Sequence, residues 1–174
     1  MESAKIVLLS TAAAICYGIL HDQVTVRICI EYFTVFHPPV FDTDNPTLLG
    51  LGWGVIATWW LGAFLGIALA LSARAGPRVK VTARELLRPV AVLLAVMALS
   101  AFLAGVSGYV LALKGVISPP VWLRGPWAQR SYNKNDFMAD LWAHNASYAA
   151  AMLGGIVLCV ITYRKRVRSS SSVS

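Results

Sequence analysis

Three long segments of this chain contain no lysine, arginine, aspartate or glutamate, and this feature constrains the fold more than any other. They cover residues 48–73, 90–113 and 141–163. A helix of about 20 apolar residues crosses the hydrocarbon core of a bilayer, which is roughly 30 Å thick. A soluble domain has about a quarter charged residues, whereas the charged fraction here is 13%. The sequence therefore predicts an all-α, polytopic membrane protein.

A fourth, shorter apolar run covers residues 6–20 and ends at His21. A signal peptide would explain Lys5 before the run and the alanines at 12–14, which resemble a cleavage site. The apolar stretch before those alanines is short, and this favours a retained first helix. The chain is then a single transmembrane domain over 1–174, a four-helix bundle. Its helices are expected at about 5–22, 48–73, 89–113 and 139–163.

The basic residues predict how the bundle is oriented. Five fall in the connector 74–88, and four more follow the last apolar run. Short cytoplasmic loops are enriched in lysine and arginine, so the connector and both termini are expected inside (N-in/C-in). Segments 23–47 and 114–138 are then outside, and a disordered tail is expected over 167–174.

Charge and hydropathy also predict the surroundings of the chain. The net charge is +7, but basic clusters beside apolar spans indicate topology and headgroup contact rather than nucleic-acid binding. The expected partner is the lipid bilayer. The expected location is the cell membrane, of the bacterial inner-membrane type if the source is prokaryotic.

The segment after the first helix has an ambiguous pattern. Residues 24–31 alternate between apolar and polar side chains, which is the period of a strand. A lone strand would leave its backbone groups unpaired in a membrane, and Val24, Ile28 and Tyr32 also share one helical face. We therefore expect an amphipathic helical extension on the outer face, ended by Pro38 and Pro39.

Small residues recur at every fourth position in two predicted spans. Small side chains let helix backbones approach closely, and such packing drives helix association in lipid. The stripes predict close contacts inside the bundle, and the same faces would suit a homo-oligomer or a larger membrane complex. The residues are Gly50, Gly54, Thr58, Gly62 and Gly66 in the second span and Ala143, Ser147, Ala151 and Gly155 in the last.

Ionisable side chains within a membrane-spanning segment are costly and tend to mark function. Here they gather at the outer ends of the first and last helices, where Asp140, His144 and Tyr148 are spaced at i, i+4 and i+8. A carboxylate and an imidazole one turn apart can bind a divalent metal, or the carboxylate can fix the imidazole tautomer. The candidate metal ligands are His21, Glu31, Asp140 and His144. Secondary polar candidates are Asp22, Arg27, His37, Asn145 and Tyr148.

Simpler roles are open for the same residues. Asp140 suits the first turn of a helix, where a carboxylate faces unpaired N–H groups, and charges near the interface reach water at little cost. Arg27 and Glu31 have the i,i+4 spacing of a helix-surface ion pair.

No motif in the sequence assigns a reaction. There is no HExxH, no CxxC and no paired ExxH, and the three cysteines lack the spacing of a metal site. We therefore expect a structural or accessory membrane component without enzymatic activity. The alternative is an outer-face protein that binds a metal or handles protons or electrons. A small transporter is the second alternative, although the second and third spans contain no ionisable residue.

Overall fold

The computed structural model describes residues 1–120 and 132–171, and within these ranges it contains helices and no strands. Four helical segments are long and apolar enough to cross a membrane. The prediction of an all-α chain with four such segments is thus confirmed, and it suggests a membrane location. The helices are α1 (Glu2–Ile28), α2 (Ile30–Thr34), α3 (Pro46–Ile56), α4 (Trp59–Arg74), α5 (Ala83–Leu113) and α6 (Lys134–Ser171).

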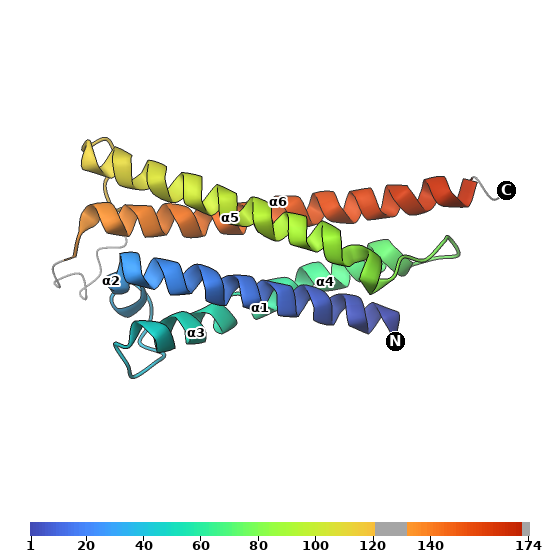
Figure 1. Cartoon of the computed structure of the whole chain (residues 1–174), viewed down its shortest axis with the longest axis horizontal. Helices are drawn as coiled ribbons and strands as arrows, with labels where there is room; N and C mark the ends of the chain where they lie inside the picture. Colours follow the sequence, from blue (N-terminus) through green and yellow to red (C-terminus); the bar gives the residue numbers. More distant parts are fainter. Residues whose placement is uncertain (121–131, 172–174) are drawn as a thin grey trace.

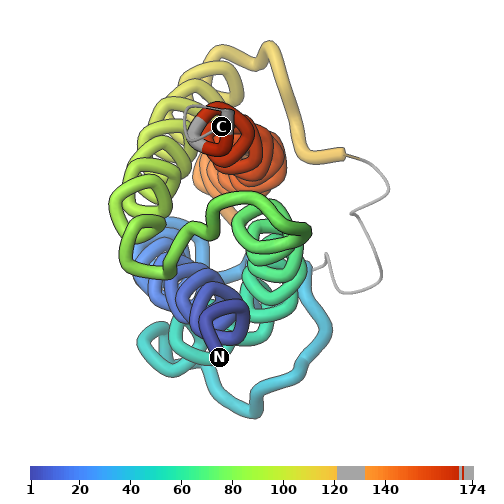
Figure 2. Tube along the Cα trace, turned by 90° about the vertical axis from the view of Figure 1, so that its right-hand side faces the viewer, coloured from blue at the N-terminus to red at the C-terminus, as the bar shows by residue number. Residues whose placement is uncertain are grey.

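The long helices form an elongated bundle (Figure 1). α1 packs against α3 and α4, α5 packs along α6, and α4 also contacts α6. The view along the bundle shows these helices arranged around a common centre (Figure 2). Both termini and the connector between α4 and α5 lie at one end, whereas α2 and the start of α6 lie at the other (Figure 1).

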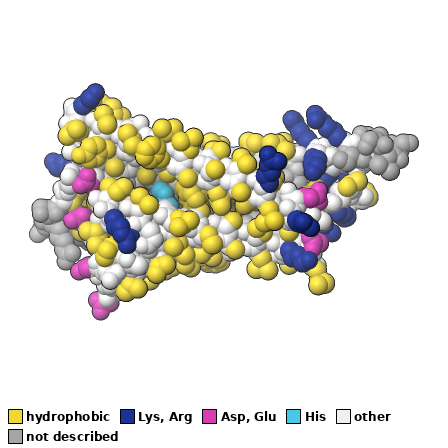
Figure 3. All heavy atoms as spheres, viewed as in Figure 1, with side chains coloured by type: hydrophobic (Ala, Val, Ile, Leu, Met, Phe, Trp, Pro, Cys, Tyr) yellow, Lys and Arg dark blue, Asp and Glu magenta, His cyan; other side chains and the backbone are white. Residues whose placement is uncertain are grey.

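Charged and apolar side chains separate along the bundle axis. Hydrophobic side chains form a band around the middle of the visible face, and charged side chains gather near the two ends (Figure 3). Many large apolar side chains of α5 and α6 are exposed, among them Phe102 at 66% and Leu153 at 67%. In water such a surface would be unfavourable, so it fits contact with lipid acyl chains.

The helices extend beyond the apolar runs of the sequence. α5 begins at Ala83, within the expected connector, because Thr82 and Glu85 form a capping box that satisfies the first N–H groups. α6 begins at Lys134 and continues through most of the expected disordered tail to Ser171. Hydropathy detects only the apolar part of a helix, so polar end turns escape it.

The second expected span consists of two helices that meet at Ala57 and Thr58. The Thr58 hydroxyl donates to the Gly54 carbonyl, which a regular helix would pair with the Thr58 N–H. That N–H instead donates to Val55, three residues back, at 3.3 Å. Hydroxyl competition for a backbone carbonyl therefore accompanies the break.

The small-residue stripe of α3 and α4 faces α1. A Cβ atom added at Gly54 would lie 2.5 Å from the Ile19 backbone, and one added at Gly62 would lie 2.9 Å from the Ser10 carbonyl oxygen. The stripe of α6 is buried as well, at Ala143, Ser147, Ala151 and Gly155. Both stripes thus lie inside this bundle.

The segment 24–34 is helical, with an interruption at Cys29. The Cys29 backbone is extended (φ −143°, ψ 91°), and it separates α1 from α2. Because the helix is broken there, the i,i+4 spacing no longer brings Arg27 and Glu31 together. Arg27 instead donates to Gln23 and to the Thr47 hydroxyl, so the expected ion pair does not form.

Candidate metal centre between α1 and α6

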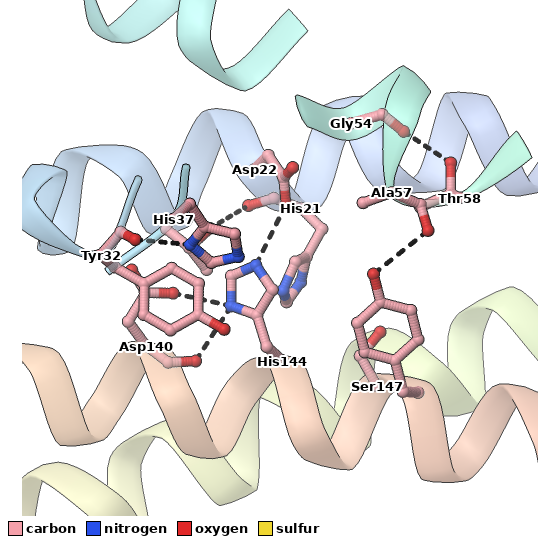
Figure 4. Close-up of polar contacts among 12 residues, drawn as sticks. His21, Asp22, Tyr32, His37, Gly54, Ala57, Thr58, Asp140, His144 and Ser147 are labelled. Carbon is pink, nitrogen blue, oxygen red and sulfur yellow. Dashed lines mark hydrogen bonds and ion pairs between the residues drawn. The ribbon is translucent and has the colours of Figure 1, made fainter. Parts of the chain in front are cut away.

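The polar centre of the bundle lies where α1 and α6 face each other near the α2 end. His21 and Asp22 come from α1, and His144 comes from α6, with its ring between Asp22 and Asp140 (Figure 4). Asp22 and Asp140 are 4% and 0% exposed, and His144 is 9% exposed. Ionisable groups buried to this extent are costly unless they are paired or bind a metal.

The contacts of His144 fix which ring nitrogen holds a proton. Nδ1 lies 3.0 Å from the backbone carbonyl oxygen of Asp140, a group that can only accept, so Nδ1–H is the donor. Nε2 lies 3.3 Å from Oδ1 of Asp22. A neutral His144 therefore directs the Nε2 lone pair toward a carboxylate. That arrangement needs a shared proton or a cation between the two atoms.

His21 completes a cluster of three potential ligands. Its ring meets that of His144 edge-on, with centroids 4.6 Å apart. One ligand atom each from His21, Asp22 and His144 lies within 4.8 Å of the other two. The His21 Nε2 atom is buried without a hydrogen-bond partner among the described residues. Two imidazoles and a carboxylate are ligands that suit several divalent transition metals.

Asp140 lies behind His144, on the side away from Asp22. Its Oδ1 atom is 2.8 Å from His144 Nδ1. Since this nitrogen is directed at the Asp140 backbone carbonyl, neither carboxylate oxygen has a well-aligned hydrogen bond in the described part of the chain. A carboxylate beside the far nitrogen of a metal-binding histidine orients the ring and raises its basicity. Asp140 is placed for that role.

Aromatic side chains close one side of the cluster. The Tyr32 ring stacks on His144 with centroids 4.6 Å apart, and Phe33 lies edge-on to the same ring. His37 lies 4.8 Å from both Tyr32 and Trp53, measured between centroids, and its Nδ1 is 2.6 Å from the Tyr32 carbonyl oxygen. Burial lowers the pKa of His37 and raises that of the Tyr32 phenol. This side of the centre is therefore shielded from water.

A cavity of about 80 Å³ lies next to the cluster, between the four long helices. At its polar end Ser147 donates to the Tyr17 hydroxyl at 3.0 Å, and Tyr148 donates to the Ala57 carbonyl at 3.2 Å. The Ala57 carbonyl is available because the helix is broken there. A water molecule needs about 10–15 Å³ of such space, so the cavity has room for several water molecules.

The structure brings together only part of the predicted site. His21, Asp140 and His144 meet, and Asp22, a secondary candidate, joins them. Glu31 is not among the residues of this cluster, and its carboxylate accepts from the Cys29 thiol instead.

The other secondary candidates lie around the cluster. Asn145 is exposed, and Arg27 is also exposed. His37 belongs to the aromatic side described above, and Tyr148 lies one turn deeper on α6. No motif in the sequence selects Tyr17 or Tyr32, although the i,i+4 spacing of Tyr17 and His21 places both on one face of α1.

Comparison of the chain with protein-family models, curated proteins and solved structures found no match.

Proposed function

We propose that this chain is an integral membrane protein that binds a divalent transition metal between α1 and α6. The ligands are His21, Asp22 and His144, and Asp140 orients His144. One observation supports this most directly. Two imidazoles and a carboxylate converge within 4.8 Å, while the buried His21 Nε2 atom has no other partner among the described residues.

The ligand set limits the kind of metal. None of the three cysteines joins the cluster in the described chain, so a thiolate centre for Cu(I) or an iron–sulfur cluster is disfavoured. Nitrogen and oxygen ligands suit Zn²⁺, Mn²⁺ or Fe²⁺. Three protein ligands leave a position for a further molecule, as in catalytic rather than closed structural sites. A metal here would also fix α1 to α6, which is compatible with the accessory role expected from the sequence.

Metal analysis of purified protein tests this proposal. The chain is purified in detergent with a tag free of histidine, loaded with Zn²⁺, Mn²⁺ or Fe²⁺ under anaerobic conditions, desalted and analysed by mass spectrometry. We expect about one metal per chain, with strong losses in His21→Gln and His144→Gln. His37→Gln is the matched control, because His37 is buried nearby but outside the cluster, and it should retain the metal.

The competing explanation is a proton shared between His144 and Asp22, with no metal at all. Negligible metal in the wild type after loading with each ion would refute the proposed metal centre. Equal losses in His37→Gln and His144→Gln would refute its position.

The orientation in the cell membrane is also part of the proposal. We place the end with both termini and the α4–α5 connector in the cytoplasm, because that connector holds Arg78 and Lys80 and adjoins the basic end of α6. The metal centre then lies toward the outer face. A cysteine introduced at the exposed Gly76 should react with a membrane-impermeant maleimide only after the cells are opened. Labelling in intact cells would show that this end faces outward, and it would refute the proposed orientation.

A further inference from the structure

A groove lies on the outside of the bundle, between α1 and α5, beside the proposed metal centre. Its volume is about 620 Å³. Leu20, Val24 and Ile28 line it from α1, and Phe102 and Val106 line it from α5. These residues belong to candidate membrane spans, so the groove opens toward lipid acyl chains rather than toward water.

The groove leads to the metal centre. His21 and Tyr17 line both the groove and the internal cavity, so these two side chains separate the lipid-facing side from the cluster. His21 is the histidine that lines the groove among the described residues. A molecule dissolved in the bilayer can therefore reach His21 sideways, without crossing an aqueous phase.

The charges around the groove select the head group of such a molecule. No lysine or arginine lines the groove in the described chain, whereas Asp136 does. Asp22 and Asp140 lie on either side of His144, and together they would balance the two charges of a bound divalent metal. Asp136 then leaves the lining of the groove negative, so a fatty acid or anionic phospholipid head would face it without a compensating cation and would be repelled. A neutral head that forms hydrogen bonds is compatible with the same surroundings.

The shape of the lining favours a flat head group. Tyr17, His21, Phe102 and Tyr109 all line the groove, and aromatic side chains pack well against planar rings. We propose that the groove binds an isoprenoid quinone or its quinol, with a ring oxygen hydrogen-bonded to His21 and the isoprenoid tail along the groove. This inference deepens the proposed function and rests on it for the position of the head group beside the metal.

The affinity should depend on the head group rather than on the tail. Lipid is as apolar as the groove, so the tail gains little by leaving the acyl chains. The hydrogen bond to His21 and the ring contacts must then provide most of the selectivity. A bulky side chain introduced into the groove would keep the quinone ring away from His21. We expect it to weaken quinone binding by about tenfold or more.

Photolabelling in nanodiscs of quinone-free phosphatidylcholine tests the inference. The probe is an azido-substituted short-chain ubiquinone, and the labelled peptides are identified by mass spectrometry. We expect label on the groove residues of α1 and α5, and its loss when unlabelled ubiquinone is added. Ala98→Trp and Val24→Trp plug the groove from its two sides and should each reduce the label at least about tenfold. Ala95→Trp, exposed on α5 outside the groove, should retain it.

The outcomes separate this inference from the proposed function. Metal content is measured on the same samples, and the two plugs should leave it unchanged. Bound metal without specific quinone labelling would overturn the quinone inference alone. Labelling without bound metal would overturn the metal centre and leave the groove as a quinone site. Equal labelling by a photoreactive phosphatidylcholine acyl chain would assign the groove to bulk lipid and overturn the inference.

Discussion

Replacing Gly54 with alanine tests the closest helix contact of the bundle. α1 and α3 meet there through two glycines, since an added Cβ at Gly54 would lie 2.5 Å from the Ile19 Cα atom and 2.8 Å from the Gly18 carbonyl carbon. Both neighbours are backbone atoms, so no side-chain rotation can relieve the overlap. The two helices must move apart.

The size of the effect follows from that distance. Carbon atoms pack best at about 3.5–4.0 Å, so α1 and α3 must separate by roughly 1 Å, and a gap of this size forfeits up to half of the local packing energy. Overpacking in a rigid interior costs about 1–3 kcal/mol. Alanine gains about 1 kcal/mol over glycine in helix propensity. We therefore expect a net loss of up to about 2 kcal/mol, toward the upper end because both neighbours are backbone atoms.

Gly105→Ala is the matched control within the same fold. A Cβ there would lie 3.4 Å from the Ala139 carbonyl oxygen and the Ala143 Cβ atom, which is ordinary contact. The control should therefore be neutral or slightly stabilising. Equilibrium unfolding in mixed micelles of mild detergent and dodecyl sulfate, followed by tryptophan fluorescence, measures both variants. Equal free energies of unfolding for the two variants would refute the close approach of α1 and α3.

Three further predictions use the same preparation. Asp140→Asn should lower metal affinity about 10–100-fold without abolishing binding at saturation, because an orienting carboxylate is lost; competition with a chelating dye measures this. Burial lowers the pKa of His37, so the unfolded chain takes up a proton first, and stability should fall as the pH drops through about 6.5. His37→Phe should reduce that fall, which unfolding at about pH 7.5 and about pH 5.5 would reveal. Arg166 is 1% exposed and donates to three backbone carbonyls at the end of α4 and in the connector, so Arg166→Met should destabilise by roughly 2–4 kcal/mol. The exposed Arg164→Met should change the free energy of unfolding little.

The sequence was sufficient for the class of fold because hydropathy and length alone specify a membrane-spanning helix. It was not sufficient for the interruption at Ala57 and Thr58. Thr58 continues the four-residue spacing of small side chains, so the stripe reads as one regular helix. Only the competition between the hydroxyl and the backbone N–H for the Gly54 carbonyl distinguishes the break, and that competition depends on the local backbone.

The candidate site was predictable within one helix but not between helices. The spacing of Asp140 and His144 placed both on one face of α6, as a period of 3.6 requires. The prediction from sequence selected Glu31 as the carboxylate ligand and placed Asp22 second, whereas Asp22 is the residue in the cluster. That choice depends on the rotation of α1 against α6 and on the change of direction at Cys29, which takes Glu31 out of the helix that bears His21.

Packing of α1 against α3 and the geometry of the proposed metal centre depend on each other. A Cβ at Gly50 would lie 3.1 Å from the Asp22 carbonyl, so the absence of a side chain lets α3 support the backbone of the residue that faces His144. Zinc–ligand distances are about 2.0–2.2 Å and tolerate shifts of only a few tenths of an ångström. The separation of roughly 1 Å that we expect for Gly54→Ala exceeds this tolerance, although Gly54 is not itself a metal ligand. The glycine stripe, which first indicates helix association, thereby also sets the position of Asp22 opposite α6.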